Sequence, residues 1–430
     1  MSLNNKQSLA FEEIKKGGNV YVSGAGGVGK SYLIEHVKSF YEKDNDTIFC
    51  GPTGVSAMNI KGATLHSTFG LPTHILRQHD AKACASKSKV AGLLKAVNRI
   101  VIDEVSMIRA DIFITIDNIL RLVKRRDEPF GGVQVIVFGD MFQLSPVLVP
   151  RDREHYNRYY DTVFCFDTQT WAEAGFVTIE LDEVIRQTDS ELISHLHNIR
   201  VGNDKVFESV SYFVNNSADA GELIQTDPII LCTTNAIADE QNRVRYEELE
   251  AEEHVFYADI KGKYADPPVE AVLKLKEGMR VMFTVNDPDK QYVNGSMGYI
   301  LEISKDMITV VIDPDDVIVY VSRYKFEQYS YEADKEGHIF PTVTASFTQY
   351  PIKAGWAVTI HKSQGKTLDR AIIDFGRGCF LSGQAYVALS RVKTIDGIGF
   401  LRGFSFSDVI TDKRVQNFYS DNCRGGLSLF

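Results

Sequence analysis

The stretch Gly24-Ala-Gly-Gly-Val-Gly-Lys-Ser31 decides the fold of this 430-residue chain. It fits the pattern G-x-x-x-x-G-K-[S/T] and follows a short β-rich run at residues 19–23, so it predicts a strand, a phosphate-binding loop and then a helix. The glycines let successive backbone N–H groups surround phosphate oxygens where the helix begins. The alternative is a glycine-rich turn without a ligand, which the preceding strand disfavours.

The loop and a later strand carry the groups that phosphoryl transfer needs. Lys30 can neutralise the β- and γ-phosphates of a nucleotide, and the Ser31 hydroxyl can bind Mg²⁺. An apolar run at 99–102 ends in Asp103 and Glu104. We expect Asp103 to hold Mg²⁺ through water and Glu104 to deprotonate the attacking water. Two solvated acids at a strand end would be the alternative if the loop were absent. The sequence therefore predicts hydrolysis of a nucleoside triphosphate.

The rest of the chain indicates an α/β fold. Short β-rich runs, each followed by a helical pattern, predict parallel sheets covered by helices. Between residues 246 and 350 the pattern changes to short strands separated by turn signals, which predicts a small antiparallel barrel inserted into the α/β part. The basic segment 77–95 predicts a helical arm or a flexible excursion.

Composition and charge restrict the class of protein. With 44% hydrophobic and 24% charged residues the chain should be globular. Its net charge of −10 taken globally argues against a nucleic-acid partner, because such proteins usually present a basic surface. Without a leader pattern or an apolar run of about 18 residues, we expect a cytoplasmic protein. We expect reduced, mostly buried thiols at the six separated cysteines, Cys50, Cys84, Cys165, Cys232, Cys379 and Cys423.

Eight motifs follow one another along the chain, at residues 24–31, 51–57, 64–67, 102–107, 139–143, 181–187, 356–365 and 384–391. Their order and spacing resemble those of superfamily-one helicases, specifically the Pif family of 5′-to-3′ DNA helicases, with RecD-like enzymes as relatives. The segment 111–132 resembles the signature of that family. One departure is Ser145, where the family usually has a second consecutive proline, which loosens the turn after Gln143.

The resemblance implies two RecA-like P-loop domains with two insertions. The first domain is expected at 1–175, with a wedge insertion at 70–95. The second is expected at 176–245 plus 351–430, and an SH3-like β-barrel insertion at 246–350.

The resemblance also implies an ATP site with Mg²⁺ as cofactor. Gln7 would read adenine, unless it is an ordinary surface glutamine. Gln143 would sense the γ-phosphate, and Arg186 and Arg391 would be arginine fingers rather than surface or structural arginines. The residues expected to bind ATP are Gln7, Gly24, Ala25, Gly26, Gly27, Val28, Gly29, Lys30 and Ser31.

For DNA, the resemblance implies contact loops at the ends of strands in both domains. Phe69 has core packing as its alternative, and His361 a structural role. The expected DNA-binding residues are Pro52, Thr53, Gly54, His66, Ser67, Phe69, Thr234, Asn235, Thr359, His361, Lys362 and Ser363.

The implied function is an ATP-dependent 5′-to-3′ DNA helicase, a monomeric motor acting on single-stranded DNA and on junctions between single- and double-stranded DNA. G-quadruplexes and RNA–DNA hybrids are further substrates implied by the resemblance. Two alternatives stay open, a translocase that strips proteins from single strands and an ATP-gated DNA-binding protein. The acidic balance does not oppose this function, because residues 246–350 hold 10 Lys and Arg against 20 Asp and Glu, which accounts for the whole net charge. We expect the acids of that insertion to point away from DNA, including Glu247, Glu248, Glu250, Glu252 and Glu253.

Overall fold

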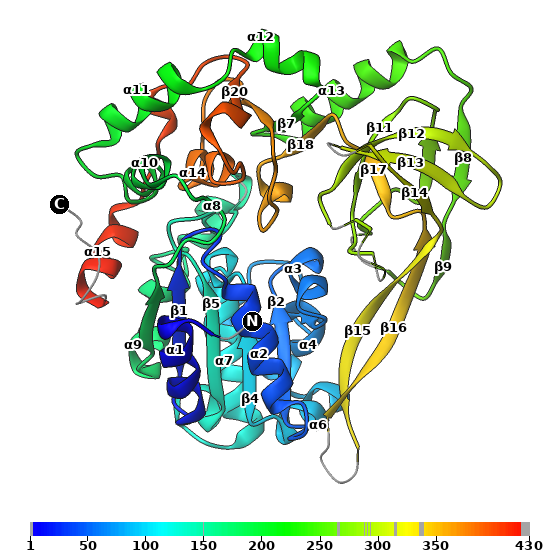
Figure 1. Cartoon of the computed structure of the whole chain (residues 1–430). Helices are drawn as coiled ribbons and strands as arrows, with labels where there is room; N and C mark the ends of the chain where they lie inside the picture. The colour runs from blue at the N-terminus through cyan, green and yellow to red at the C-terminus, as the bar shows by residue number, and fades with distance from the viewer. Residues whose placement is uncertain are drawn as a thin grey trace. The chain divides into compact units, whose positions relative to one another are not determined.

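The computed structural model describes residues 3–148, 150–264, 267–287, 289, 291–292, 294–313, 316–334 and 339–422. The chain forms two compact units (Figure 1). The first comprises Met1–Ile185, Gln328–Thr344 and Asp412–Leu429, and the second comprises Arg186–Glu327 and Ala345–Thr411. Parallel sheets with helices, together with antiparallel sheets, confirm the predicted fold class.

A six-stranded parallel sheet organises the first unit, in the order β3-β2-β4-β5-β1-β6. Its strands are β1 (Val20–Gly24), β2 (Thr47–Gly51), β3 (Ala63–Thr64), β4 (Arg99–Ile102), β5 (Gln134–Gly139) and β6 (Val177–Leu181). Every residue of β1 and β5 is buried. Such apolar strands suit the centre of a parallel sheet, because helices cover both of its faces.

Helices of the first unit supply the covering layers. Apolar residues on one face of α1 and α2, such as Ile14 and Leu33, pack into the same core as Val22 and Phe138. The segment 77–95 forms the helices α5 and most of α6, as a helical arm predicts. The helices are α1 (Asn5–Lys15), α2 (Lys30–Tyr41), α3 (Gly54–Asn59), α4 (Leu65–Phe69), α5 (Gln78–Ala85), α6 (Ser88–Ala96), α7 (Ala110–Lys124), α8 (Pro150–Tyr156), α9 (Gln169–Ala174) and α15 (Lys413–Asn422), with short 3₁₀ turns η1 (Val105–Met107), η2 (Pro129–Gly132) and η3 (Cys165–Asp167).

The second unit contains a smaller parallel sheet, in the order β18-β7-β19-β20. Its strands are β7 (Ile229–Cys232), β18 (Ala357–Thr359), β19 (Ala371–Asp374) and β20 (Ile398–Phe400). The helices around it are α10 (Ser190–Val201), α11 (Val206–Asn216), α12 (Ala220–Leu223), α13 (Asn235–Glu248) and α14 (Gln384–Leu389), and the short turns are η4 (Ile224–Thr226), η5 (His361–Ser363), η6 (Ile395–Gly397) and η7 (Phe406–Asp408).

The β-rich insertion is antiparallel, as its turn signals predict. Its largest sheet has the order β14-β13-β12-β11-β17, and smaller sheets have the orders β10-β8 and β15-β16-β9. Buried residues such as Val281, Val310 and Ile352 form its core. The strands are β8 (His254–Tyr257), β9 (Asp259–Lys261), β10 (Val272–Leu275), β11 (Arg280–Phe283), β12 (Met297–Ile303), β13 (Ile308–Ile312), β14 (Val317–Val321), β15 (Tyr324–Ala333), β16 (Ile339–Gln349) and β17 (Ile352–Ala354).

The structure draws the domain boundaries differently from the expected ones. The first unit continues past residue 175 to Ile185, because β6 pairs along its whole length with β1. It also takes in α15, which was expected in the second domain, because Tyr419 of α15 hydrogen-bonds to Ser23 at the end of β1. The insertion extends past 350, because β17 pairs with β11.

The described cysteines are free thiols, four of them buried and Cys379 half-buried, while Cys423 lies outside the described residues. No helix in the described part of the chain is both long and apolar enough to span a membrane.

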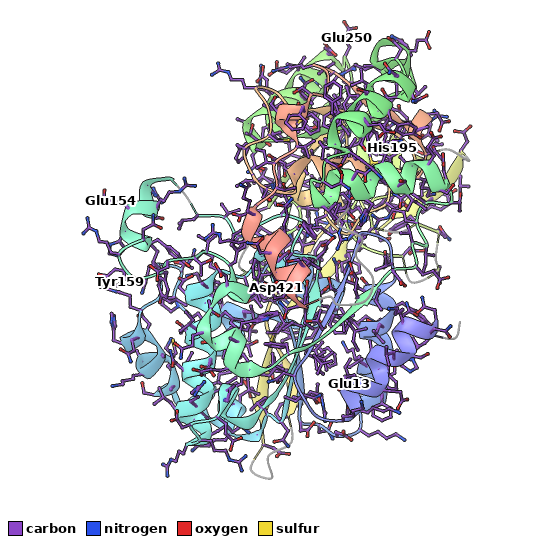
Figure 2. The ribbon with its side chains drawn as sticks, turned by 90° about the vertical axis from the view of Figure 1, so that its left-hand side faces the viewer. Glu13, Glu154, Tyr159, His195, Glu250 and Asp421 are labelled. Carbon is purple, nitrogen blue, oxygen red and sulfur yellow. The ribbon has the colours of Figure 1, made fainter. Side chains whose placement is uncertain are left out.

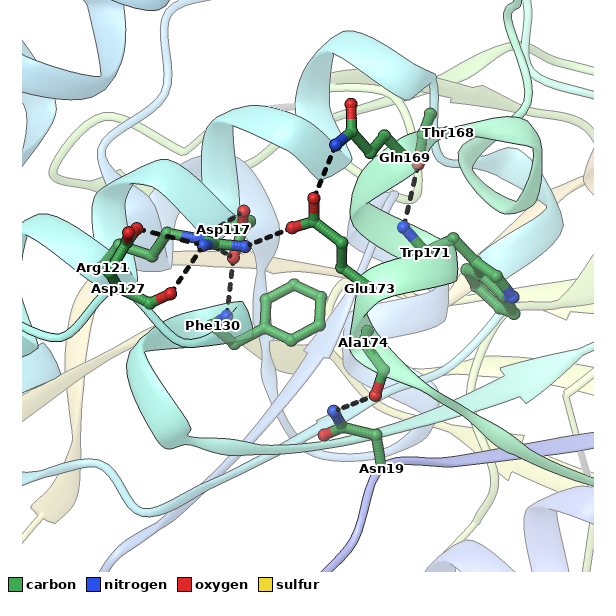
Figure 3. Close-up of polar contacts among 10 residues, drawn as sticks. All are labelled: Asn19, Asp117, Arg121, Asp127, Phe130, Thr168, Gln169, Trp171, Glu173 and Ala174. Atoms are coloured by element: carbon green, nitrogen blue, oxygen red, sulfur yellow. Dashed lines mark hydrogen bonds and ion pairs between the residues drawn. The ribbon is translucent and has the colours of Figure 1, made fainter.

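The signature segment 111–132 is part of the scaffold (Figure 3). Arg121 donates through Nε to the buried Asp117 carboxylate at 2.9 Å, and the same carboxylate accepts the Phe130 N–H at 2.6 Å. The Arg121 guanidinium also forms ion pairs with Asp127 and Glu173. These contacts join α7, η2 and α9 and so fix the chain that leads into β5.

We expect Asp117→Asn to lower the free energy of unfolding of the first unit by about 2–4 kcal/mol, because it leaves the Arg121 guanidinium without its buried counter-charge. Glu173→Gln is the matched control, and it should cost less than about 1 kcal/mol since Glu173 is exposed. Urea unfolding followed by Trp171 fluorescence, in a Trp356→Phe background, measures both variants. Equal losses in the two variants would contradict the assigned role of Asp117.

Candidate functional site

The phosphate-binding loop connects β1 to α2 through backbone that only glycine adopts readily. Gly29, the N-cap of α2, has a φ of 84°, and a Cβ there would lie 2.5 Å from Nε2 of Gln7. A Cβ on Gly24 would lie 2.7 Å from the carbonyl oxygen of Leu181. A side chain at either position would force the loop to shift. With glycine at both, the loop can place its backbone N–H groups at the N-terminus of α2, a 12-residue helix.

Lys30 and Ser31 stand at the first turn of α2. The Lys30 ammonium donates to the carbonyl oxygens of Gly24 at 2.6 Å and Ala25 at 2.9 Å, so it lies across the loop. Ser31 is exposed. The ammonium, the helix N-terminus and the loop amides together form an arrangement that suits the phosphates of a nucleotide.

The predicted acid pair follows β4. Oδ1 of Asp103 accepts the Glu104 N–H at 2.9 Å, and Glu104 has a φ of 52°, a left-handed conformation that ends the strand. Burial raises the pKa of Asp103 to about 7, and the neighbouring Glu104 carboxylate adds to the rise while Lys30 opposes it. A buried carboxylate beside a second acid is favourable when a divalent cation balances the charge. Asp103 and the Ser31 hydroxyl therefore fit an Mg²⁺ site.

Gln143 lies in the buried loop that follows β5. Its Nε2 donates to Oδ2 of Asp140 at 3.4 Å, and its backbone N–H donates to the Asp140 carbonyl oxygen at 2.9 Å. The other carboxylate oxygen of Asp140 accepts the Phe142 N–H at 3.2 Å. Asp140 thus organises the loop that carries the predicted γ-phosphate sensor.

Gln7 is not a surface glutamine, because it is only 3% exposed. Its Oε1 accepts the Asn4 N–H, which completes a capping box at the start of α1. Its Nε2 donates to the carbonyl oxygen of Gly29 at 3.3 Å. Gln7 therefore contacts the last glycine of the phosphate-binding loop.

The two candidate arginine fingers lie in the second unit and converge on Ser390. Arg186 donates through Nη1 to the Ser390 carbonyl oxygen at 2.9 Å. Arg391 donates through Nε to the Val387 carbonyl oxygen and through Nη2 to the Ser390 hydroxyl, both at 2.8 Å. Arg391 is 1% exposed, so the surface reading of this residue is wrong.

Most DNA-binding candidates of the first unit lie on two helix N-termini. Thr53 caps α3 by accepting the Ser56 N–H at 3.1 Å, and it is half-buried, as are Pro52, Gly54, His66 and Ser67. Burial lowers the pKa of His66, which favours its neutral form. Phe69 is 0% exposed, which favours core packing, the alternative to base stacking for this residue.

The candidates of the second unit divide into exposed groups and groups that shape the loop. Asn235 and Lys362 are exposed, and Thr234 caps α13. Thr359 and Ser363 are buried: Thr359 accepts the Lys362 N–H at 3.4 Å, and the Ser363 hydroxyl donates to the Ile360 carbonyl oxygen at 2.7 Å. These two hydroxyls therefore hold η5 in shape.

His361, which the sequence predicted, lies in η5. The sequence did not point to two lysines of the same unit, Lys353 and Lys366. Nε2 of His361 is shielded and has no hydrogen-bond partner among the described residues, and burial lowers its pKa. Lys353 of β17 is paired with Met282 of β11, and the Lys366 ammonium lies 3.5 Å from the Met282 sulfur. Burial lowers the pKa of Lys366 to about 7, with a contribution from Lys353.

Burial likewise lowers the pKa of Lys353 to about 8, with a contribution from Lys362. In the part of the chain that the structure describes, neither Lys353 nor Lys366 has an ion pair. Half-buried like charges without counter-ions favour an anionic ligand. No sequence signal links the two lysines, because they meet only through the intervening strand β11.

Comparison with known proteins identifies similar chains. A family model described as PIF1-like helicase matches residues 2–204. ATP-dependent DNA helicase PIF1 of Xenopus laevis is 33% identical over 92% of this chain and 61% of its own length. ATP-dependent DNA helicase Pif1 of Campylobacter jejuni is 31% identical over 95% of this chain and 96% of its own. The chain spans about three fifths of the Xenopus relative and nearly all of the Campylobacter one.

Solved structures of a Bacteroides Pif1 are similar over the whole chain. Its complex with ADP-AlF4 is 33% identical, with a TM-score of 0.88 and coverage of 99% of this chain and 98% of the other. Its structure bound to ssDNA is also 33% identical, with a TM-score of 0.68 and coverage of 98% and 97%.

Two substitutions at Gln7 separate its helix-capping role from its contact with the loop. Gln7→Glu keeps the acceptor for the Asn4 N–H but replaces the donor to the Gly29 carbonyl oxygen with a repelling carboxylate. We expect it to weaken nucleotide affinity about tenfold with little loss of stability. Gln7→Ala should weaken affinity and also cost about 1 kcal/mol of stability, because the cap is lost.

Titration with a fluorescent ADP analogue measures affinity, and thermal unfolding measures stability. Wild-type affinity in Gln7→Glu would show that Gln7 only caps α1.

Proposed function

Because the chain belongs to the PIF1-like helicase family, we propose that it is an ATP-dependent DNA helicase. The observation that carries this proposal is the shared edge of the first sheet. Lys30 follows β1, the acid pair follows β4 and Gln143 follows β5, and these three strands are adjacent. The Bacteroides relative was solved with ADP-AlF4, which supports ATP as the nucleotide.

We propose a mechanism in which the chain positions ATP for attack by water. The loop amides and Lys30 bind the phosphates, and Glu104 accepts a proton from the attacking water. Ser31 and Asp103 would hold Mg²⁺, which would supply charge neutralisation on the β- and γ-phosphates. Arg186 and Arg391 would supply further positive charge as the γ-phosphate leaves.

Gln143 would then report the state of the γ-phosphate. Its amide is held by Asp140 in a buried loop, so a contact to phosphate would be transmitted through a well-defined backbone. The helix caps at Thr53 and Thr234 and the exposed Lys362 are proposed to grip the phosphates of single-stranded DNA. If ATP binding and hydrolysis alternately strengthen and weaken these phosphate contacts, the protein would move along the strand in the 5′-to-3′ direction.

Single-stranded DNA is the proposed primary ligand, which the Bacteroides structure bound to ssDNA supports. Junctions, G-quadruplexes and RNA–DNA hybrids are proposed as substrates of a monomeric, cytoplasmic enzyme. The acidic residues Glu247, Glu248, Glu250, Glu252 and Glu253 are all exposed, and Figure 2 shows Glu250 on the surface of the second unit. We propose that this acidic surface faces away from DNA.

Two variants test the proposed chemistry. Lys30→Ala should lower both ATP affinity and kcat, whereas Glu104→Gln should lower kcat about 10²- to 10⁴-fold and retain ATP binding, because it removes only the base. ATPase rate with and without single-stranded DNA, and strand displacement on a forked duplex, are the measurements. Lys16→Ala and Glu12→Gln on α1 are controls that should behave as wild type.

Absence of stimulation by DNA, or normal hydrolysis in both active-site variants, would contradict the proposal. Rapid DNA-stimulated hydrolysis without strand displacement, but with removal of a protein block, would favour a translocase instead.

The depressed pKa values of Lys366 and Lys353 predict a pH-dependent grip on DNA. Both ammonium groups are largely protonated at pH 6.5 and largely neutral at pH 8.5, so affinity for single-stranded DNA should fall as pH rises through this range. Among the described residues, Lys362 contributes to the lowered pKa of Lys353, and Nη1 of Arg391 donates to the Lys366 carbonyl oxygen.

Fluorescence anisotropy with a labelled oligothymidine measures this dependence at several salt concentrations. At pH 6.5, Lys366→Gln should reduce the salt slope by about 0.7, because one phosphate contact is lost. Lys366→Arg should keep tight binding at pH 8.5, and Lys393→Gln, at an exposed lysine paired with Asp369, is the control. A wild-type affinity that is independent of pH would contradict the prediction.

A further inference from the structure

Tyr419, on the last described helix, is built into the phosphate site of the first unit. Its side chain has no exposed surface. It lies on α15 (Lys413–Asn422), the helix that also carries Asp421, which Figure 2 labels. Its phenolic oxygen lies 2.7 Å from the Ser23 hydroxyl and 2.9 Å from the Tyr21 hydroxyl. Ser23 is the residue immediately before the phosphate-binding loop.

The same oxygen also contacts the loop after β5. It accepts the Met141 N–H at 3.2 Å and donates to Oδ1 of Asp140 at 3.4 Å. A phenol has one proton to donate and two lone pairs, so these two bonds leave one acceptor site for the hydroxyl of Ser23 or Tyr21. The Tyr419 ring stacks on Phe142, with ring centroids 4.6 Å apart and planes 21° apart.

These contacts form a continuous chain of hydrogen bonds to Gln143. Tyr419 donates to one carboxylate oxygen of Asp140, and the other oxygen accepts from the amide of Gln143. Asp140 is 0% exposed, so protein donors must hold its carboxylate in place of water. A carboxylate that loses one of its donors can rotate, and that rotation would move the Gln143 amide.

We propose that Tyr419 is a positioning residue for ATP hydrolysis, acting through Asp140 to hold Gln143 in the orientation that meets the γ-phosphate. This inference rests on the proposed ATPase function and extends it to a residue 276 positions beyond Gln143 in the chain. A second bond, to Ser23, ties the same hydroxyl to the strand that carries the phosphate-binding loop. The Tyr419 hydroxyl of α15 therefore contacts both the residue before the phosphate-binding loop and the loop that carries Gln143.

The alternative is that Tyr419 only fastens α15 to the sheet. That role predicts a loss of stability with unchanged kinetics of the folded protein. The positioning role predicts a lower kcat for ATP hydrolysis and an unchanged affinity for ADP. ADP affinity should not change because ADP lacks the γ-phosphate that Gln143 would contact.

Tyr419→Phe tests the inference, because it removes the hydroxyl and keeps the ring that stacks on Phe142. We expect kcat for DNA-stimulated ATP hydrolysis to fall about tenfold, with KM for ATP and Kd for ADP within about twofold of wild type. Tyr156→Phe is the matched control, since it also removes a buried hydroxyl of the first unit, one that donates to the Thr162 carbonyl oxygen. It should leave kcat unchanged. The number of ADP molecules bound per protein molecule gives the folded fraction of each variant, and each rate is divided by that fraction.

A double-mutant cycle with Asp140→Asn identifies the route. Asp140→Asn should also lower kcat, and adding Tyr419→Phe should produce little further loss, because both act on Gln143 through the same carboxylate. If Tyr419→Phe does not fold, Asp140→Asn still tests the proposal. A normal kcat in Asp140→Asn would show that Asp140 does not position Gln143. Independent, multiplicative losses would overturn this route as well.

Unchanged kcat in folded Tyr419→Phe would overturn the positioning role while active wild-type protein upholds the proposed function. A wild-type protein without ATPase activity would overturn both.

Discussion

The parallel direction of β1, β4 and β5 is the constraint on which the candidate site depends. Parallel neighbours bring their carboxyl ends to one edge of a sheet, so the loops that follow them must meet there. The phosphate-binding loop, the acid pair and Gln143 occupy these three loops. Candidate site residues from distant parts of the chain are therefore brought to one edge of the sheet by strand direction.

The electrostatics of the site follow from its burial. The pKa of Asp103 is raised by burial and by the neighbouring Glu104 carboxylate, and the pKa values of Lys353 and Lys366 are lowered by burial and by neighbouring lysines. Each pair is unfavourable without a ligand and favourable with one of opposite charge.

Local sequence patterns predicted much of this structure. The alternation of strands and helices predicted the parallel sheets, and the glycine motif predicted the strand, loop and helix β1–α2, because these features depend on neighbours in the chain. The burial of Phe69 and the extension of the first unit to Ile185 could not be read from local sequence, since core packing and the pairing of β6 with β1 depend on tertiary contacts. No sequence pattern pointed to Lys353, Lys366 or Tyr419. The two lysines approach each other across the strand β11, and the partners of Tyr419 on β1 lie 398 and 396 positions earlier in the chain.

The return of α15 to β1 has a consequence for synthesis of the chain. Tyr419 bonds to Tyr21 and Ser23, which lie 398 and 396 positions earlier in the chain, so this part of the first unit can close only after residue 419 has been synthesised. A nascent chain holds the phosphate-binding loop long before it holds the helix that braces it.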